Sequence, residues 1–326
     1  MDEARSLGVN PGDTLYFWGK KIDPALLAWA QANQIAVKFV EDGFIRSLGL
    51  GSALSKPISL VMDSRGIYFD PTGPSDLEHI LKTTEFSEEL LEQAAVLIDK
   101  IQSANLTKYN HLSDQIDLGI RAAVGQRVIL VPGQVDDDMS VKFGAFGLNN
   151  LSLLEKVREA CPDAYIIFKP HPDVLSKNRH GDLPDDQVLV FADQVIKYAG
   201  IGAVIAQVDE VHTMTSLAGF DALLRGKVVF CYGLPFYAGW GLTNDLHCCE
   251  RRGRCLTLEA LVAAALVLYP IYLNPKTNRF CSALEALDYM AEQKQLLSRS
   301  WLRRFVMRFN GLVFPRIRNV AKSMMG

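Results

Sequence analysis

The chain has 326 residues, 49% of them hydrophobic, and a formal net charge of −3. This length is too great for one ordinary hydrophobic core and suits two domains of roughly 150 residues each. The near-neutral charge gives no reason to expect a nucleic-acid partner. The longest apolar run, Leu261 to Leu268, is far shorter than the roughly 20 residues that span a bilayer. Because no apolar run follows a basic start at the N-terminus, we expect a cytoplasmic protein.

Short apolar runs alternate with helical patterns along the chain. Strands are predicted at residues 14–19, 35–40, 128–132, 164–169 and 227–235, and helices at residues 24–33 and 151–160. Such alternation is typical of α/β units with parallel sheets. From Leu256 to the tail the pattern predicts helices only.

A mostly helical and polar segment, Ser87 to Gly125, separates the two sets of strands. It has the character of a connection between domains. We therefore predict an N-terminal domain at residues 1–125, a second domain at residues 126–298 and a tail at residues 299–326.

The predicted tail carries seven basic residues and no acidic ones. Apolar side chains are interleaved with the arginines, among them Trp301, Phe305 and Phe309. This spacing predicts a helix with one apolar stripe that lies on a membrane surface. A terminal helix packed on the body of the protein is the alternative.

Polar side chains gather where three predicted strands end. The candidates are Glu41, Asp42 and Arg46 after the strand at 35–40, Asp136 to Asp138 after the strand at 128–132, and Lys169, His171 and Asp173 after the strand at 164–169. Ligands of open parallel sheets bind at the ends of the strands, where the helices begin. These three junctions are therefore the candidate site.

A fourth motif, T-M-T-S-L-A-G-F-D, starts a predicted helix. Thr215 or Ser216 can cap this helix, which leaves the backbone N–H groups around Ser216 and Leu217 available to a ligand. Free N–H groups at a helix N-terminus favour a phosphate. The motif therefore predicts a phosphate-binding turn.

Six strings of the sequence together resemble one known family. They are E-D-G-F-I-R-S, P-G-Q-V-D-D-D-M-S, K-P-H-P-D, T-S-L-A-G-F-D-A-L-L-R-G, L-P-F-Y-A-G-W-G-L-T-N-D and L-V-L-Y-P-I-Y-L-N-P-K-T-N. In this order and spacing, from about Thr14 to Met290, the chain is similar to the bacterial capsule polysaccharide transferases that add β-linked Kdo. The resemblance implies a GT-B-like α/β fold, with two Rossmann-like domains facing a cleft and helices at the C-terminal end.

The resemblance also implies the substrates and partners. Members of the family use CMP-β-Kdo to extend a short Kdo linker on a phosphatidylglycerol lipid, and some fuse two such modules in one polypeptide. The expected partners are therefore a Kdo-terminated glycolipid acceptor, the inner face of the cytoplasmic membrane, a second transferase module and a capsule export complex. Because a CMP-sugar has a single phosphate and needs no diphosphate-chelating metal, we expect no metal cofactor.

A β-linked donor and a β-linked product imply retention through a covalent sugar–enzyme ester, which requires a nucleophilic carboxylate. By resemblance this is Asp138, two positions before Ser140. Asp136 and Asp137 then cap the following helix or raise solubility, and either is the alternative nucleophile.

The resemblance makes Glu41 the base that takes the acceptor proton. Asp42 can exchange roles with Glu41, and a hydrogen bond from Glu41 to a backbone N–H of its turn is the structural alternative. Arg46 lies where it can hold a Kdo carboxylate, or it makes an interdomain salt bridge.

The remaining predicted site residues face the donor. By resemblance His171 contacts the donor phosphate or the sugar, and a protonated imidazole there would stabilise the departing CMP. Lys169 adds positive potential or merely snorkels. Asp221 accepts ribose hydroxyls, although relatives usually carry glutamate there. Tyr237 shapes the cleft floor or is an ordinary core aromatic, and Ser216 with its neighbouring N–H groups holds the phosphate.

Two classes of function follow from these residues. The first is a retaining Kdo transferase, with a transferase for another CMP-activated acid sugar or a GT-B-like epimerase as variants. The second is a catalytically silent sugar-nucleotide-binding scaffold of a capsule assembly complex. Catalysis is favoured because a scaffold has no physical need for Glu41, Asp138 and His171 together.

Overall fold

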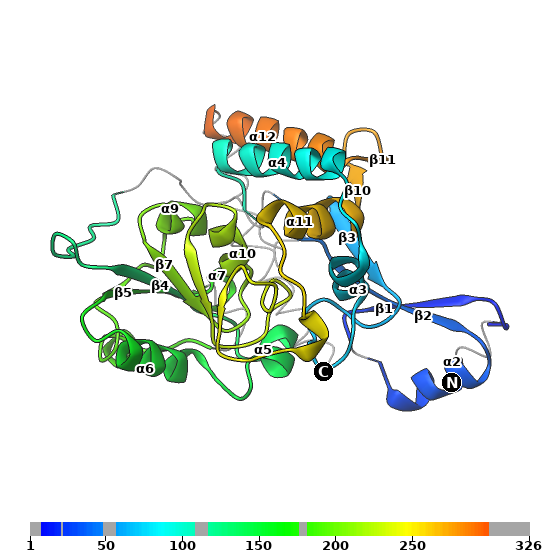
Figure 1. Ribbon diagram of the computed structural model, residues 1–326, viewed down its shortest axis with the longest axis horizontal. Coiled ribbons are helices and arrows are strands. Elements are labelled where there is room, and N and C mark those ends of the chain that lie inside the picture. Colours follow the sequence, from blue (N-terminus) through cyan, green and yellow to red (C-terminus); the bar gives the residue numbers. More distant parts are fainter. Residues whose placement is uncertain (1–7, 21, 48–56, 108–116, 176–180, 300–326) are drawn as a thin grey trace, which may run out of the picture.

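The computed structural model describes residues 8–20, 22–47, 57–107, 117–175 and 181–299 (Figure 1). The strands are β1 (Thr14–Trp18), β2 (Ala36–Asp42), β3 (Ser59–Asp63), β4 (Val128–Pro132), β5 (Tyr165–Lys169), β6 (Gln194–Val195), β7 (Glu210–Thr213), β8 (Val228–Cys231), β9 (Asn244–Asp245), β10 (Pro270–Asn274) and β11 (Arg279–Cys281). The helices are α2 (Pro24–Ala32), α3 (Asp76–Thr83), α4 (Glu88–Ser103), α5 (Met139–Gly144), α6 (Asn150–Ala160), α7 (Pro172–Leu175), α8 (Asp185–Val188), α9 (Ile201–Ile205), α10 (Leu217–Leu223), α11 (Leu258–Val262) and α12 (Ala283–Arg299), with the short 3-10 helix η2 (Glu250–Arg252) and the π-helix η3 (Ala263–Leu268). Apart from Arg299, the predicted tail lies outside the described residues.

The second sheet is parallel throughout, in the order β6-β5-β4-β7-β8-β9. Numbered along the chain from β4, this is the 3-2-1-4-5-6 order of a Rossmann fold. All five residues of β4 are buried, which explains why a central strand covered on both faces reads as a continuous apolar run. The strand order reverses between β4 and β7, so a crevice is expected at their C-terminal ends.

The first sheet is mixed, in the order β1-β2-β3-β10-β11. Only β1 and β2 pair in parallel, while the other three pairs are antiparallel. The prediction of a parallel sheet is therefore wrong for most of this half. The α/β architecture with two sheets, intervening helices and C-terminal helices nevertheless confirms the predicted GT-B-like fold.

The prediction of helices alone after Leu256 is wrong at Pro270–Cys281. This segment forms β10 and β11, and β10 pairs with β3, more than 200 residues earlier in the chain. Pro270 and Pro275 prevent a helix from continuing through this segment. Tyr272 is buried while its neighbours Ile271 and Leu273 are exposed, which is the two-residue alternation of a strand. The predicted domain ranges stay a prediction, but residues 270–281 belong to the first sheet.

Helices α4 and α12 lie beside each other, joined by a salt bridge between Lys100 and Asp288 (Figure 1). Together with α11 they cover the end of the molecule at the top of Figure 1. No helix in the described ranges combines the length and the apolar character needed to cross a membrane.

A buried ion-pair cluster joins the two halves. Glu78 of α3 accepts hydrogen bonds from Arg251 Nε (2.7 Å) and Arg252 Nε (3.0 Å). Arg252 is itself buried and also donates to the backbone carbonyls of Pro235 (2.5 Å) and Ala238 (3.0 Å). These bonds anchor the segment after β8, which borders the pocket described below, on a helix of the first half.

We expect Glu78→Gln to lower the free energy of unfolding by about 3 kcal/mol, because removing one charge of a buried cluster leaves the other uncompensated. Denaturant unfolding followed by circular dichroism measures the loss. Glu155→Gln, at an exposed position of α6, is the matched control and should change stability by less than about 0.5 kcal/mol. Equal stabilities of the two variants would contradict the role given to the cluster.

Candidate functional site

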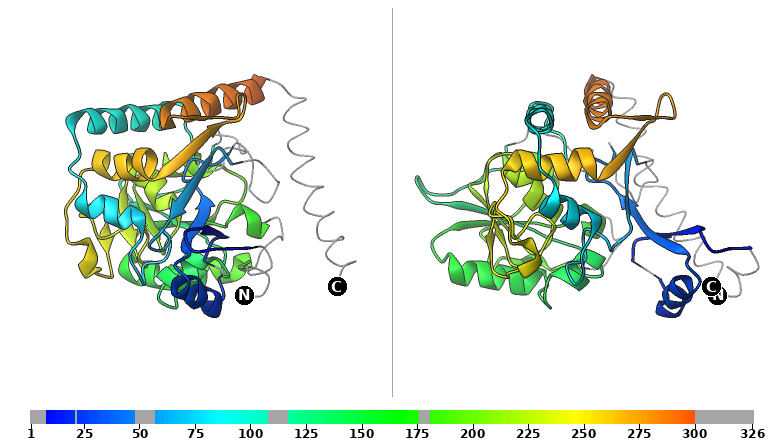
Figure 2. Two further views of the ribbon diagram at one scale, coloured as in Figure 1. Left: turned by 90° about the vertical axis from the view of Figure 1, so that its right-hand side faces the viewer. Right: turned by 45° about the vertical axis from the view of Figure 1, so that its right-hand side comes forward.

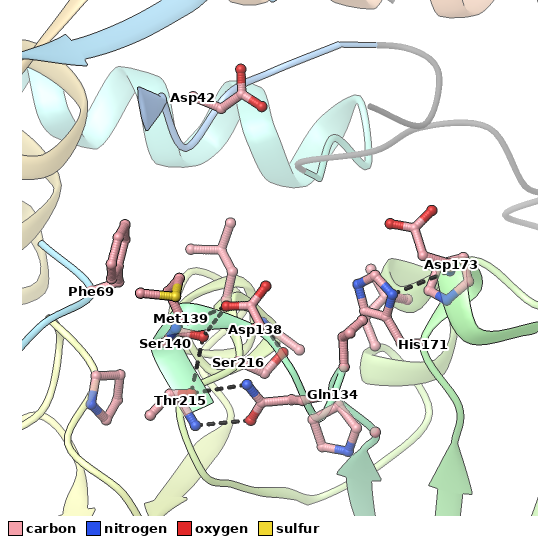
Figure 3. Close-up of a pocket in the computed structure, with 18 of the residues that line it drawn as sticks. Asp42, Phe69, Gln134, Asp138, Met139, Ser140, His171, Asp173, Thr215 and Ser216 are labelled. Atoms are coloured by element: carbon pink, nitrogen blue, oxygen red, sulfur yellow. Dashed lines mark hydrogen bonds between the residues drawn. The ribbon is translucent and has the colours of Figure 1, made fainter. Parts of the chain in front are cut away.

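A pocket of about 590 Å³ lies where the strands of the second sheet end, and both halves of the molecule line it (Figure 3). The second half contributes the segments after β4, β5 and β7 and the start of α9. From the first half come Trp18, Gly19, Glu41, Asp42, Tyr68 and Phe69. The pocket therefore occupies the crevice expected at the switch point between β4 and β7.

Four helices of the second half begin at this pocket. Asp138 caps α5, Gly200 precedes α9, Ser216 caps α10, and His171 lies just before α7. The first N–H groups of a helix have no partner within it and carry partial positive charge. Several such ends around one pocket favour an anionic ligand, and a phosphate above all.

Asp138 has two structural features that bear on its chemistry. Its Oδ1 accepts hydrogen bonds from the backbone N–H (2.9 Å) and the hydroxyl (2.8 Å) of Ser140. Its other oxygen accepts no hydrogen bond from the described residues and points away from Ser140 (Figure 3). Asp138 thus combines a fixed orientation with one carboxylate oxygen available to a ligand.

The structure corrects the roles predicted for the neighbouring aspartates. Asp138 caps α5, so the prediction that Asp136 or Asp137 caps this helix is wrong. Both are exposed, and Asp137 also lines the pocket. The reason is geometric, since the cap is the residue directly before the first helical turn.

Gln134, which the sequence reading missed, joins the loop after β4 to the turn before α10. It is buried, its Nε2 donates to Thr215 Oγ1 (2.9 Å), and its Oε1 accepts from the Thr215 N–H (2.9 Å). Thr215 Oγ1 in turn bonds to Ser140 Oγ (3.3 Å), which donates to Asp138. One chain of hydrogen bonds therefore fixes Asp138 relative to the turn before α10 (Figure 3).

We expect Gln134→Met to lower the free energy of unfolding by about 1–3 kcal/mol, because the Thr215 N–H loses its buried partner. Displacement of the Thr215 turn should also reduce the activity proposed below by at least about tenfold. Denaturant unfolding and steady-state kinetics measure the two effects. Gln187→Met, at an exposed position of α8, is the control, and a Gln134 variant that behaves like it would refute the coupling.

Glu41 and Asp42 end β2 on the side of the pocket opposite Asp138 (Figure 3 shows Asp42). Glu41 Oε1 accepts the N–H of Asp42 (3.0 Å), so the backbone bond considered as its structural role is present. Glu41 nevertheless lines the pocket, as does Asp42. The two halves thus place carboxyl groups on both sides of one cavity.

Arg46 does not line the pocket, contrary to the expectation that it holds a substrate carboxylate. It is buried, and its Nε forms an ion pair with Asp42 while its Nη1 donates to Ser47 Oγ (3.1 Å). The four-residue spacing brings the two charges together on one turn. Arg46 therefore contacts a pocket residue of its own half, Asp42, and does not reach the pocket itself.

Lys169 is the buried cation of the pocket. It ends β5, only 4% of its surface is exposed, and its ammonium makes no ion pair or hydrogen bond with the described residues. Burial penalises the charged ammonium and lowers the pKa of Lys169 to about 8. A buried lysine without a counter-charge that borders a cavity is suited to receive an anion from outside the protein.

His171 lies near Asp138 on the next loop of the sheet edge (Figure 3). Its Nδ1 accepts the backbone N–H of Asp173 (3.2 Å). An imidazolium has no lone pair on Nδ1, so this bond favours the neutral ring with its proton on Nε2. The role of a protonated imidazole stays a prediction.

Thr215, Ser216, Leu217 and Asp221 all line the pocket, as the sequence reading expects. Asp221 is mostly buried and lies 3.7 Å from Arg225, the residue four positions later.

Tyr237 does not line the pocket, so of the two roles expected for it the structure supports the core aromatic and not the cleft floor. It is fully buried, and its hydroxyl donates to the Ser216 carbonyl (2.5 Å). A Cβ at Gly219 would lie 2.2 Å from that hydroxyl. Glycine at this position therefore lets Tyr237 support the turn from below.

No group of three or more His, Cys, Asp or Glu side chains in the described ranges is arranged to hold a metal ion. The cationic character of the pocket comes instead from Lys169, the more exposed Lys142 and the helix N-termini.

The chain is similar in sequence and in fold to known proteins. The family described as "Capsule polysaccharide biosynthesis protein" matches residues 17–272. The capsule polysaccharide modification protein LipA of Neisseria meningitidis serogroup A is 46% identical over 285 residues, which cover 84% of this chain and 40% of LipA. The chain therefore spans less than half the length of this curated relative. The family match runs from the end of β1 into β10 and includes every residue that lines the pocket, whereas β11 lies beyond it.

Two solved structures are also similar to the chain. Thermosulfurimonas dismutans KpsC, beta Kdo 2,7 transferase, is 39% identical with a TM-score of 0.71, covering 90% of this chain and 88% of that one. Thermosulfurimonas dismutans KpsC, beta Kdo 2,4 transferase, is 32% identical with a TM-score of 0.76, covering 85% and 86%. Both matches extend over the two halves of the molecule.

Proposed function

Because the chain belongs to the capsule polysaccharide biosynthesis protein family, we propose that it is a retaining β-Kdo glycosyltransferase. It transfers Kdo from CMP-β-Kdo to a Kdo-terminated glycolipid at the inner face of the cytoplasmic membrane. Similarity to the two KpsC Kdo transferases, at 39% and 32% identity, supports Kdo as the sugar that is transferred. The observation that carries the proposal is the single pocket lined by Asp138 from one half and by Glu41 and Asp42 from the other.

The first displacement uses Asp138. Its free carboxylate oxygen attacks the anomeric carbon of Kdo, the bond from that carbon to the phosphate oxygen breaks, and CMP leaves with the electron pair. The bonds from Ser140 to Oδ1 hold the carboxyl plane during the attack. His171 donates a hydrogen bond from Nε2 to the leaving phosphate, which disperses the developing charge.

The second displacement restores the original configuration. An acceptor hydroxyl attacks the same carbon from the opposite side, the ester bond to Asp138 breaks, and Glu41 takes the hydroxyl proton. Asp42, held by Arg46, lines the same pocket as Glu41. Asp138 therefore acts at one face of the sugar ring, and Glu41 activates the acceptor hydroxyl at the opposite face.

The donor binds at the C-terminal ends of the strands of the second sheet, beside Lys169 and the helix N-termini. CMP-Kdo carries a phosphate and a carboxylate, and Lys169 with the N–H group of Leu217 receives these anions. The Ser216 N–H already donates to Thr213 Oγ1 (3.2 Å), so the contribution expected of this group is corrected. Asp221 accepts the ribose hydroxyls. No step requires a metal, because a departing monophosphate is already a stabilised anion.

The test is transfer by the full chain from CMP-Kdo to a synthetic Kdo-terminated acceptor. The expected product carries one additional Kdo in β-linkage, read by mass spectrometry and by NMR of the anomeric centre. NMR also distinguishes a 2,4 from a 2,7 bond. Transfer from CMP-sialic acid but not from CMP-Kdo would show a different acid sugar, and tight CMP-Kdo binding without turnover would indicate a scaffold.

A further inference from the structure

One face of the first sheet is apolar and open to solvent. Strand pairing places alternate residues of β1, β2, β3, β10 and β11 on this face, here called the open face. Its exposed large apolar side chains are Tyr16, Trp18, Met62, Ile271, Leu273 and Phe280. The left view of Figure 2 looks toward this half of the molecule from the right-hand side of Figure 1, where β1 and β2 lie.

The opposite face of the same sheet is the core face. Phe39, Val61 and Tyr272 lie on it and are buried. By contrast, Tyr16 and Trp18 are each 57% exposed and Phe280 is 79% exposed. Since an aromatic side chain has about 150–250 Å² of surface, the open face presents an apolar patch of several hundred Å². Patches of this size mark surfaces that bind a partner or a membrane.

The open face is continuous with the pocket. Trp18 lies on the open face and also lines the pocket, and Asp42 shares the same strand face through its pairing with Leu60. Both belong to the half that carries Glu41, the proposed base for the acceptor. A partner resting on the open face therefore lies beside the acceptor side of the site.

The charges of the open face indicate the chemistry of that partner. Paired strand positions place Lys38 on it beside Tyr16, and Lys38 has no ion pair with any residue in the described ranges. The other charge, Asp42, is already paired with Arg46. In a symmetric dimer built on this face, the acid that the second copy could offer to Lys38 is Asp42, which Arg46 already pairs. An anionic surface would neutralise Lys38.

We propose that the open face docks on a bilayer containing anionic phospholipid, with the pocket opening beside the membrane surface. Aromatic side chains such as Trp18 and Tyr16 favour the boundary between headgroups and acyl chains, and a lysine among them can extend its ammonium to a lipid phosphate. This inference rests on the proposed function, because a lipid-linked acceptor explains why the site and the docking surface adjoin.

The experiment compares flotation of the full-length chain with vesicles of phosphatidylcholine and with vesicles that also contain phosphatidylglycerol. The double variant Leu273→Glu/Phe280→Glu, on paired positions remote from the pocket, should bind phosphatidylglycerol vesicles at least tenfold more weakly. Lys38→Glu should weaken binding at low salt and less at high salt. Tyr198→Glu, at a 77% exposed position of the second half, should bind like the parent chain.

A second readout does not depend on the fold of the double variant. Lipids brominated near the headgroup should quench a component of tryptophan fluorescence that disappears in Trp18→Phe. Unchanged flotation of a folded double variant, or identical quenching with and without Trp18, would overturn the proposal. So would a dimer of the parent chain that the double variant converts to a monomer, because a second copy would then cover the face.

Failure of the proposed function gives a different pattern. Transfer to a lipid-free Kdo acceptor should be retained in the Leu273→Glu/Phe280→Glu variant, because neither residue lines the pocket. If no transfer occurs even in the parent chain, the enzymatic proposal fails while the vesicle measurements still report on the open face.

Discussion

Asp138→Asn is expected to lose about ten-thousand-fold in transfer rate while the protein keeps its fold. An amide cannot form the sugar ester, so the covalent route closes. Asparagine caps helices as well as aspartate and can still accept the Ser140 N–H bond. The loss should therefore appear in kcat, with little change in the unfolding transition. Initial rates with saturating donor and acceptor measure it.

Ser140→Ala is the matched control for this prediction. It removes the hydroxyl that donates to Asp138 Oδ1 but leaves the free oxygen in place, so we expect a loss of no more than about tenfold. If Asp138→Asn retains more than about one hundredth of the activity, the nucleophile lies elsewhere. Asp137→Asn is then the next variant, because Asp137 also lines the pocket.

Lys169→Met is expected to weaken donor use at least about hundredfold and to stabilise the protein at the same time. The folded-state pKa of about 8 lies below the ordinary value of 10.5. The buried charge therefore costs stability at every pH below about 8, and this cost disappears as the pH rises from there toward 10.5. The difference corresponds to about 3 kcal/mol at 1.36 kcal/mol per pKa unit. Methionine keeps an apolar stem without the charge.

Denaturant unfolding at pH 7 should show the variant about 1–3 kcal/mol more stable than the parent chain, with a smaller difference at pH 10. In the parent chain kcat/KM for the donor should fall above about pH 8 as Lys169 loses its proton. This alkaline limb should be absent in Lys169→Met. Lys156→Met, at an exposed position of α6, should alter neither property. Unchanged donor kinetics in Lys169→Met would assign this lysine a purely structural role.

The second sheet and its functional edge follow from local patterns. Central parallel strands are buried on both faces, so β4 and β5 are continuous apolar runs that are easily recognised. The polar residues that follow such strands necessarily gather at one edge of the sheet. For this reason Asp138, Lys169 and His171 could be assigned to one site from the sequence alone.

The first sheet depends on pairing between distant segments, which local patterns do not report. Nothing near Ile271 in the sequence indicates Leu60 as its neighbour across the sheet. The two prolines and the alternation of Pro270–Asn274 did indicate a strand. The apolar helical pattern that precedes this segment continues up to Pro270, so the strand reads as part of the helix.

Several site assignments depend on contacts that only the folded chain supplies. Tyr237 lies beneath the pocket because Gly219 leaves room for its hydroxyl. Gln134 is a neutral residue beside three aspartates, and only its burial against Thr215 shows its role. The pairing of Arg46 with Asp42 is different, because opposite charges four residues apart in a tight turn predict an ion pair from the sequence alone.

The two halves are proposed to supply one acid each to the same transfer: Asp138 attacks the anomeric carbon, and Glu41 then takes the proton of the acceptor hydroxyl. Glu41→Gln, incubated with CMP-Kdo and the acceptor, should complete the first displacement and stall before the second, because no base removes the acceptor proton. Acid quenching, digestion and peptide mass spectrometry should then find Kdo on the peptide that contains Asp138, and no adduct in Glu41→Gln/Asp138→Asn. An adduct on a different residue, or full transfer by Glu41→Gln, would contradict the account.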